Sequence, residues 1–173
     1  MQIIYNKEEA VNLLLQQELV VIFQGHSEWG PRALGNRSML FDPRNKNAKE
    51  IVNKVKGRQW WRPTAATILY EHRHDYLDMH TLDESPYMTF AIDAKQKAIN
   101  KVPACVHVDN TCRFQTLKRE QNPNYYDLIN LLAPVNTSLD TTNSRHIFLH
   151  CITRINVLCG ASVIIFIMNK SLF

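Results

Sequence analysis

The sequence predicts a mixed domain of the α/β (α+β) class. Two patterns support this prediction. Amphipathic segments alternate with short, continuous apolar runs before residue 70, and several segments of strand composition follow after residue 86. The length of 173 residues and a hydrophobic fraction of 45% are enough for one domain with a sizeable core.

The first predicted element is a helix over residues 6–17. Asn6 can cap this helix, and Glu9 stands at its third position, as in a capping box. A continuous apolar run then predicts a buried strand over residues 18–25, which ends at Gly25. The opening of the chain therefore predicts a helix that leads directly into a core strand.

The middle of the chain predicts a second strand, a second helix and a third strand. Residues 38–43 form a short strand that an Asp-Pro pair closes, and residues 45–58 form a helix that stops at Gly57. Residues 64–70 have strand composition. The polar segment 72–86 predicts an irregular loop.

The next part of the chain predicts three more strands and one helix. The strands are expected over residues 87–93, 104–109 and 112–117, and the helix over residues 122–133, starting near Pro123. Together with the earlier elements, these strands predict an α/β or α+β sheet domain.

Residues 141–173 form a divergent apolar tail whose structure the sequence does not specify. His150, Thr153 and Arg154 interrupt its apolar stretch, which has no clean period. Because an arginine near the middle of a membrane helix is costly, we expect a terminal strand–helix piece and no membrane span.

The composition indicates which kind of ligand the protein binds and in which compartment it works. The formal net charge of +4 suits an anionic small-molecule substrate or a phosphate-rich cofactor, and it is weaker than in most dedicated nucleic-acid binders. The four cysteines form no C-x-x-C pair, and the N-terminus shows no basic segment followed by an apolar one. We therefore expect a cytoplasmic protein.

The segment from residue 30 to residue 44 is a candidate anion site. Arginine supplies forked, permanently charged donors, and glycine lets the backbone approach a phosphate closely. The segment follows a buried strand, and the ends of strands are where ligands bind open α/β sheets. The alternative is a structural connection whose arginines pair with Glu28 and Asp42. Its arginines are Arg32, Arg37 and Arg44.

A second basic cluster lies at the end of the helix predicted over residues 45–58. Cations there can bind phosphate, or they can simply complement the helix dipole. Its two adjacent tryptophans can stack on a purine, although packing on a core is their commoner use. The cluster comprises Lys54, Lys56, Arg58, Trp60, Trp61 and Arg62.

A third cluster alternates polar and apolar residues. His107, Asp109 and Arg113 would share one face of a strand if the register ran unbroken. The alternative is a solvated hairpin, because the Asp-Asn-Thr sequence from residue 109 favours a turn.

Several other site classes are not supported. His72 and His74 have an H-x-H spacing with His80 nearby, but the polar segment around them favours a loop, and we predict no metal site. The sequence contains no G-x-S-x-G, no Walker A loop and no G-x-G-x-x-G.

The motifs "GPRALGNRS", "VNKVKGRQWWRP", "VPACVHVDNTCRFQT" and "NPNYYDLI" occur in a fixed order. Over residues 1–140 they resemble the C-terminal domain of the ATP-dependent carbamoyltransferases. The resemblance implies a YrdC-like fold, an open twisted sheet with flanking helices and a basic concave face. It also implies that this domain binds ATP, with Mg²⁺, and carbamoyl phosphate. It would form carbamoyl-adenylate for transfer to a hydroxyl by a separate N-terminal domain.

The resemblance also implies which residues form the site. The expected catalytic residues are Lys56, Arg58, Arg62 and Arg113. The expected substrate- and nucleotide-binding residues are Arg32, Asn36, Arg37, Ser38, His107, Asp109, Asn136, Thr137 and Ser138.

The sequence departs from the family after residue 138. Leu139 and Asp140 stand where the family has Phe and Asn, and no Gly-Glu-Pro segment follows. A carboxylate near a polyphosphate opposes binding. Three functions therefore stay open: an enzyme domain, a remnant that binds nucleotide or a partner without turnover, and a weak RNA- or DNA-binding module.

Overall fold

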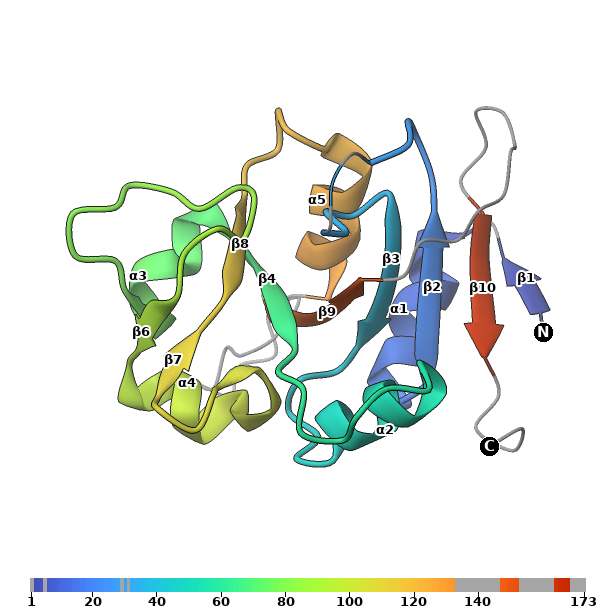
Figure 1. Cartoon of the computed structure of the whole chain (residues 1–173). Coiled ribbons are helices and arrows are strands. Elements are labelled where there is room, and N and C mark those ends of the chain that lie inside the picture. The colour runs from blue at the N-terminus through green and yellow to red at the C-terminus, as the bar shows by residue number, and fades with distance from the viewer. Residues whose placement is uncertain are drawn as a thin grey trace, which may run out of the picture.

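The computed structural model describes residues 2–4, 6–28, 30, 32–132, 147–152 and 164–168, with 2–4, 147–152 and 164–168 described by their backbone alone. The described strands form two open sheets flanked by helices (Figure 1). This arrangement confirms the predicted α/β class. In the larger sheet β4 and β8 pair in parallel, and every other described pairing is antiparallel.

The larger sheet has seven described strands. Their order across the sheet is β1 (Gln2–Ile4), β10 (Ile164–Met168), β2 (Leu19–Phe23), β3 (Arg37–Phe41), β9 (Ile147–Ile152), β4 (Ala65–Leu69) and β8 (Phe114–Leu117). The smaller sheet contains β5 (Leu77–Asp78), β6 (Ile92–Ala94) and β7 (Thr111–Cys112).

Five α-helices and two short 3-10 helices are described. The α-helices are α1 (Lys7–Leu15), α2 (Ala48–Val55), α3 (Arg73–Tyr76), α4 (Gln96–Lys101) and α5 (Pro123–Leu131). The 3-10 helices are η1 (Tyr70–His72) and η2 (Pro103–Cys105). Within the described ranges, no helix combines the length and the apolar character that crossing a bilayer requires.

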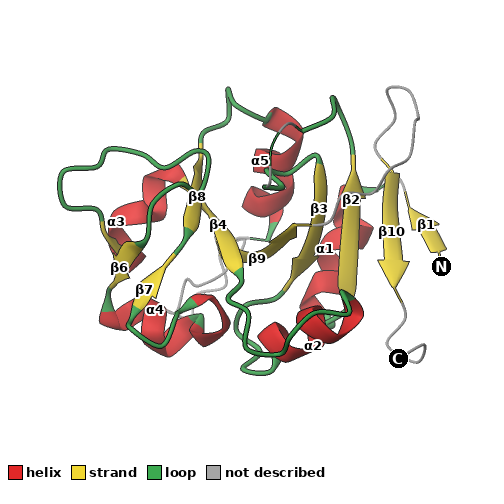
Figure 2. Ribbon diagram, in the orientation of Figure 1, coloured by secondary structure: helices red, strands yellow, loops and turns green. Residues whose placement is uncertain are grey.

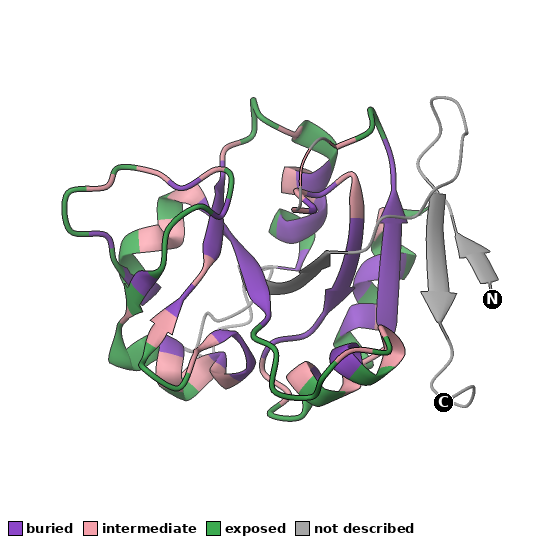
Figure 3. Ribbon diagram, in the orientation of Figure 1, coloured by how far each residue is buried: buried purple, intermediate pink, exposed green. Residues whose placement is uncertain are grey.

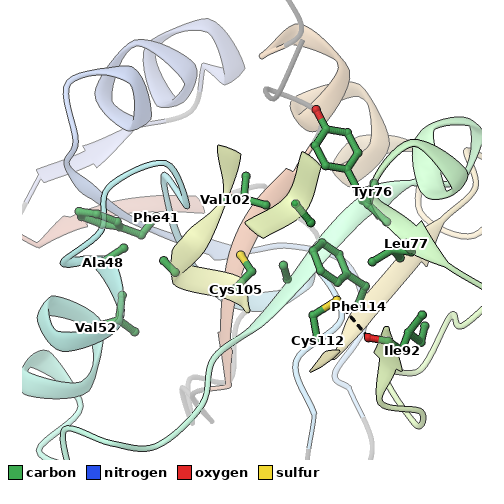
Figure 4. Packing of buried hydrophobic residues seen from close by; sticks show 14 of the residues in the cluster. Phe41, Ala48, Val52, Tyr76, Leu77, Ile92, Val102, Cys105, Cys112 and Phe114 are labelled. Atoms are coloured by element: carbon green, nitrogen blue, oxygen red, sulfur yellow. Dashed lines mark hydrogen bonds between the residues drawn. The ribbon is translucent and has the colours of Figure 1, made fainter. Parts of the chain in front are cut away.

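Alternate residues of the central strands pack into two separate core layers, one on each face of the sheet. Val20 and Ile22 of β2 pack with α1 and α5, whereas Leu19 and Val21 pack in the layer that includes α2, α3 and α4. Figure 3 shows that strands β2 and β4 are coloured as buried, whereas the helices that flank them are buried on one side and exposed on the other. Figure 4 shows the second layer, in which Cys112 donates its thiol to the Ile92 carbonyl at 3.4 Å.

Local signals explain the elements that the sequence predicted correctly. The Asn6 side chain caps α1 by accepting from the backbone N–H of Glu8 at 2.9 Å. All five residues of β2 are buried, as a continuous apolar run requires. Gly57 follows α2 with a φ of +59°, the left-handed conformation that commonly ends a helix.

Three predicted stretches are wrong. The segment predicted as a loop over residues 72–86 contains α3 and β5, and it buries Tyr76, Leu77 and Met79. The strand predicted over residues 87–93 begins only at Ile92, after a long loop shown in Figure 2. Tertiary burial, which local composition does not reveal, recruits the few apolar side chains of the first segment.

The third wrong stretch is the strand predicted over residues 104–109. Pro103 begins the 3-10 helix η2 there, and a tight turn follows. Asn110 in this turn has a φ of +61°, which a continuing strand does not accommodate. The solvated hairpin is therefore closer to the observed structure than a strand.

Two strands come from the tail of the chain. The backbone of β9 pairs with β3 on one side and with β4 on the other. The backbone of β10 pairs with β1 and β2. The sheet is therefore assembled from segments that lie far apart in the sequence.

Candidate functional site

A pocket of about 600 Å³ opens beside the start of α2. One wall comes from α2 and the connection between α2 and β4, and the other comes from η2 and the turn before β7. Its charged or polar lining residues are Lys49, Thr64, His107 and Asp109. Its apolar lining residues are Trp61, Pro63, Ala104, Val106 and Val108.

Asn53 gives the α2–β4 connection its shape. This side chain is fully buried, and its Nδ2 donates to the backbone carbonyls of Trp60 at 2.8 Å and Arg62 at 3.0 Å. Its Oδ1 accepts from Arg58 Nε. Because Asn53 holds the backbone on both sides of Trp61, the exposed indole of Trp61 can line the pocket.

The opposite wall is a turn that His107 and Thr111 close. The backbone N–H of His107 donates to the Thr111 carbonyl at 2.8 Å, and the Asn110 N–H donates to the His107 carbonyl at 3.1 Å. Asp109 Oδ1 accepts from the backbone N–H and the hydroxyl of Thr111, at 2.9 and 2.8 Å. The turn therefore fixes His107 and Asp109 at the pocket.

The two walls are joined below the pocket. The Thr64 hydroxyl donates to the Ala104 carbonyl at 2.8 Å in a buried hydrogen bond. The backbone N–H of Ala66 donates to the Arg113 carbonyl at 3.1 Å. Arg113, which directly precedes β8, is thereby held at the same end of the sheet as the pocket.

Neighbouring groups shift the pKa of two residues that line the pocket. Burial lowers the pKa of His107; the carboxylate of Asp109 opposes this shift, and the charges of Arg113 and Lys49 add to it. His107 is therefore mainly neutral at pH 7. Its Nδ1 lies 3.1 Å from Thr111 Oγ1, whose own proton is donated to Asp109, so Nδ1 carries the imidazole proton and Nε2 is an acceptor. Donors from the Thr111 backbone and hydroxyl lower the pKa of Asp109, which keeps its carboxylate ionised.

A buried cationic donor of the α2–β4 connection is unsatisfied. Arg58 Nη2 is buried and has no hydrogen-bond partner within the part of the chain that the structure describes. A buried donor without a partner is costly, and a bound anion would satisfy it. Asn53 connects this guanidinium to the loop that carries Trp61.

The predicted residues of the β2–β3 loop lie elsewhere. This loop leaves the end of β2 and enters β3 at the top of Figure 1, whereas α2 follows β3 at the bottom. Asn36 Oδ1 accepts from Asn122 Nδ2 at 2.9 Å, just before α5. The Leu34 carbonyl accepts from Gln115 Nε2 at 3.2 Å. The loop is therefore packed against α5 and β8.

Internal partners hold the backbone and the arginine of this loop. The carboxylate of Glu28 accepts from the backbone N–H groups of Leu34 and Asn36, both at 2.7 Å, and of Arg37 at 3.2 Å. The Arg37 guanidinium donates to backbone carbonyls and lies 3.6 Å from the centroid of the Phe23 ring.

Two further residues near this loop also have internal partners. The buried Ser38 hydroxyl accepts from the Gly35 N–H at 2.9 Å. Arg44, beyond β3, pairs with Asp42, as the structural alternative expects.

The structure thus divides the predicted site residues into groups. His107 and Asp109 line the pocket, and Arg58 and Arg62 flank the loop that carries Trp61. Lys56 caps the C-terminus of α2 at the base of that loop. Half-buried Arg32 belongs to the β2–β3 loop with Asn36, Arg37 and Ser38. Asn136, Thr137 and Ser138 lie outside the described residues.

Sequence reasoning missed four polar or charged residues of the site and its support, which are Lys49, Asn53, Thr64 and Glu28. Lys49 and Asn53 are four residues apart on α2, so helical spacing could have placed them on one face. Glu28 was considered only as an ion-pair partner, but its main role is to accept backbone N–H groups, which no side-chain pattern signals.

Comparison with known proteins places the chain among its relatives. Nodulation protein NolO of Bradyrhizobium diazoefficiens is 42% identical over 109 residues, which are 62% of this chain and 20% of that protein. Nodulation protein U of Sinorhizobium fredii is 39% identical over 111 residues, which are 64% of this chain and 20% of that protein. The uncharacterized protein MJ1051 of Methanocaldococcus jannaschii is 42% identical over 118 residues, which are 68% of this chain and 22% of that protein.

The chain spans about a fifth of the length of these curated relatives. The family described as "Carbamoyltransferase C-terminus" matches residues 11–170, which include most of the tail. The resemblance that the basic motifs suggested is therefore confirmed: the chain belongs to the carbamoyltransferase C-terminus family.

Proposed function

We propose that this domain binds ATP and carbamoyl phosphate at the pocket beside α2 and forms carbamoyl-adenylate. The observation that carries the proposal is a pocket lined by Lys49 and His107, one wall of which is the loop that Asn53 holds next to the unsatisfied Nη2 of Arg58. Both proposed substrates are multivalent anions, which bind where cationic donors converge.

In the proposed reaction, water releases inorganic phosphate from carbamoyl phosphate and leaves carbamate. A carbamate oxygen then attacks the α-phosphorus of ATP, and the bond to the bridging oxygen of pyrophosphate breaks. Negative charge grows on the leaving pyrophosphate, so fixed cations can stabilise the transition state without covalent help. Arg58, Arg62, Lys56 and Arg113 are the proposed source of that charge.

The residues at the pocket also fit the Mg²⁺ that accompanies ATP. Mg²⁺ keeps several waters and is bound by substrate phosphates with one or two carboxylates. Asp109 supplies an ionised carboxylate at the pocket, and only its Oδ1 is used by Thr111. Asp109 would hold the ion, which would neutralise phosphate charge when bound.

Transfer of the carbamoyl group to a hydroxyl is proposed to need a separate domain. The supporting observation is that the chain spans about a fifth of the length of its relatives. The product of this domain would then be the activated intermediate, held in the pocket until that domain accepts the group.

The test is carbamoyl phosphate-dependent exchange of pyrophosphate into ATP. Arg58→Ala should lower the exchange rate at least about 100-fold, because a donor at the developing charge is lost. The matched control is Arg119→Ala, since Arg119 is an exposed arginine in the β8–α5 connection at the far end of the sheet (Figure 1).

Two results would contradict the proposal. One is the absence of exchange in the wild-type protein. The other is an Arg58→Ala variant that matches Arg119→Ala while its far-ultraviolet circular dichroism shows an intact fold. Calorimetry that detects ATP binding without exchange would instead support the non-catalytic remnant.

A further inference from the structure

The walls of the pocket beside α2 differ in chemical character. Trp61, Pro63 and Val108 contribute apolar surface, whereas Lys49 and His107 contribute polar atoms. A volume of about 600 Å³ lies within the usual range for drug-sized ligands and cofactors. Carbamoyl phosphate is a small polar anion that offers nothing to the apolar wall. A nucleotide offers both a flat base and a charged phosphate chain.

Trp61 is suited to stack on a base. The residue is 57% exposed although it lines the pocket, so one surface of the indole is open to a ligand. The two hydrogen bonds from Asn53 to the backbone of Trp60 and Arg62 fix the loop around it. A loop whose backbone is already fixed loses little conformational entropy when a base stacks on the ring that it carries.

Lys49 is suited to contact phosphate. It lies in the first half of α2 and lines the same pocket. Among the residues that the structure describes, no carboxylate forms an ion pair with its ammonium group. Its charge contributes to the lowered pKa of His107, which places the two groups within electrostatic reach of each other.

We infer that Trp61 and Lys49 are the nucleotide-specific walls of this pocket. The base of a nucleoside triphosphate stacks on the Trp61 indole, and its phosphates contact the Lys49 ammonium. Carbamoyl phosphate binds without either side chain. This inference rests on the proposed function but assigns residues and a ligand orientation that the function alone does not require.

The test compares neighbouring residues of one type. Trp60 is 69% exposed, adjacent to Trp61 and absent from the pocket lining, so Trp60→Ala is the matched control for Trp61→Ala. Exposed Lys54 of the same helix gives Lys54→Ala as the control for Lys49→Ala. Calorimetry measures Kd for MgATP and for adenosine, and exchange kinetics give KM for carbamoyl phosphate.

The expected results separate the two contacts. Trp61→Ala should raise Kd about tenfold for both MgATP and adenosine, and Trp61→Phe should restore most of the binding. Lys49→Ala should raise Kd for MgATP about tenfold and leave that for adenosine unchanged. Both controls should match wild type, and KM for carbamoyl phosphate should change less than about twofold in every variant.

Other outcomes overturn the inference. These are a Trp61→Ala variant that binds like Trp60→Ala, equal weakening of MgATP and adenosine by Lys49→Ala, or a parallel rise in KM for carbamoyl phosphate. A wild-type protein that binds no MgATP also overturns it. A wild-type protein that binds MgATP without exchange refutes the proposed reaction alone, and the Kd ratios still decide the roles of the two residues.

Discussion

At the scale of single residues, Glu28 and His107 show how burial changes the role of a titratable group. Burial raises the pKa of Glu28, while its three backbone N–H donors and the charge of Arg37 oppose that shift. The carboxylate thus serves as an internal acceptor for the backbone N–H groups of the β2–β3 loop. His107 is held neutral by its partly buried position at the pocket.

Replacing Glu28 should destabilise the fold. Glu28→Ala leaves the backbone N–H groups of Leu34, Asn36 and Arg37 without their acceptor, so we expect a loss of about 2–3 kcal/mol in the free energy of unfolding. Urea denaturation measures this loss. Exposed Glu120→Ala is the control and should lie within about 0.5 kcal/mol of wild type. Equal stabilities of the two variants would contradict the assigned role.

Stability should depend on pH through His107. Its folded-state pKa is lower than the 6.5 of an unfolded chain, so the unfolded state binds the proton more readily. The contribution of neutral His107 to the free energy of unfolding is complete above about pH 6.5, and it is lost as the pH falls through the folded-state pKa. Urea denaturation between about pH 7 and about pH 5 should show a smaller loss in His107→Asn than in wild type. If the free energy of unfolding fell equally in the variant and in wild type over this pH range, a group other than His107 would cause the loss.

At the scale of elements, individual side chains fix the backbone of two connections, one between α2 and β4 and one between β2 and β3. Asn53 orders the α2–β4 connection, and Glu28 orders the β2–β3 loop. Gly35 adds a steric requirement, because a Cβ atom there would lie 2.2 Å from Cδ1 of Tyr125. The Tyr125 ring cannot move aside easily, since it is fully buried and its hydroxyl donates to Thr67 Oγ1 at 3.0 Å.

Two glycine substitutions should therefore differ in their effect. Gly35→Ala combines a φ of +109° with the clash against Tyr125, and we expect a loss of about 3 kcal/mol or more. Gly57→Ala has a φ of +59° but no atom within 4 Å of the new Cβ, and we expect a loss of roughly 1 kcal/mol. Thermal unfolding followed by circular dichroism measures both. Equal losses would mean that backbone conformation alone matters at Gly35.

At the scale of the whole molecule, the larger sheet depends on its late strands. β9 is the strand that joins β3 to β4, so it links the half of the sheet with α1 to the half with β8 and the smaller sheet. In β9, Ile152 pairs with Ser38 of β3, and His150 pairs with Ala65 of β4. An unpaired gap between β3 and β4 would expose two strand edges.

Truncation should test this dependence. A chain that ends after Leu132 lacks both β9 and β10, and we expect it to lose its cooperative unfolding transition. A chain that ends after Met168 keeps both strands and should unfold like the 173-residue chain. Thermal and urea unfolding compare the two. A cooperative transition in the shorter chain would show that the first 132 residues form a complete core.

The sequence by itself determined the elements whose signals are local. These include α1 with its Asn6 cap, the all-apolar strand β2, the Gly57 stop of α2 and the helix α5 that begins at Pro123. Periodicity, caps and proline act within a few residues, so they can be predicted from the sequence. The same holds for the basic residue types that pointed to an anion site.

Only the tertiary structure decided which of those basic residues meet. Arg37 begins β3 and α2 follows its end, and a five-residue strand spans roughly 16 Å. The β2–β3 loop and the basic residues after α2 are therefore held at opposite ends of the sheet. The pocket instead joins α2 to a turn that lies about 50 residues later in the chain. The pairing of the strands brings α2 and this turn together, and the spacing of residues along the sequence does not reveal that pairing.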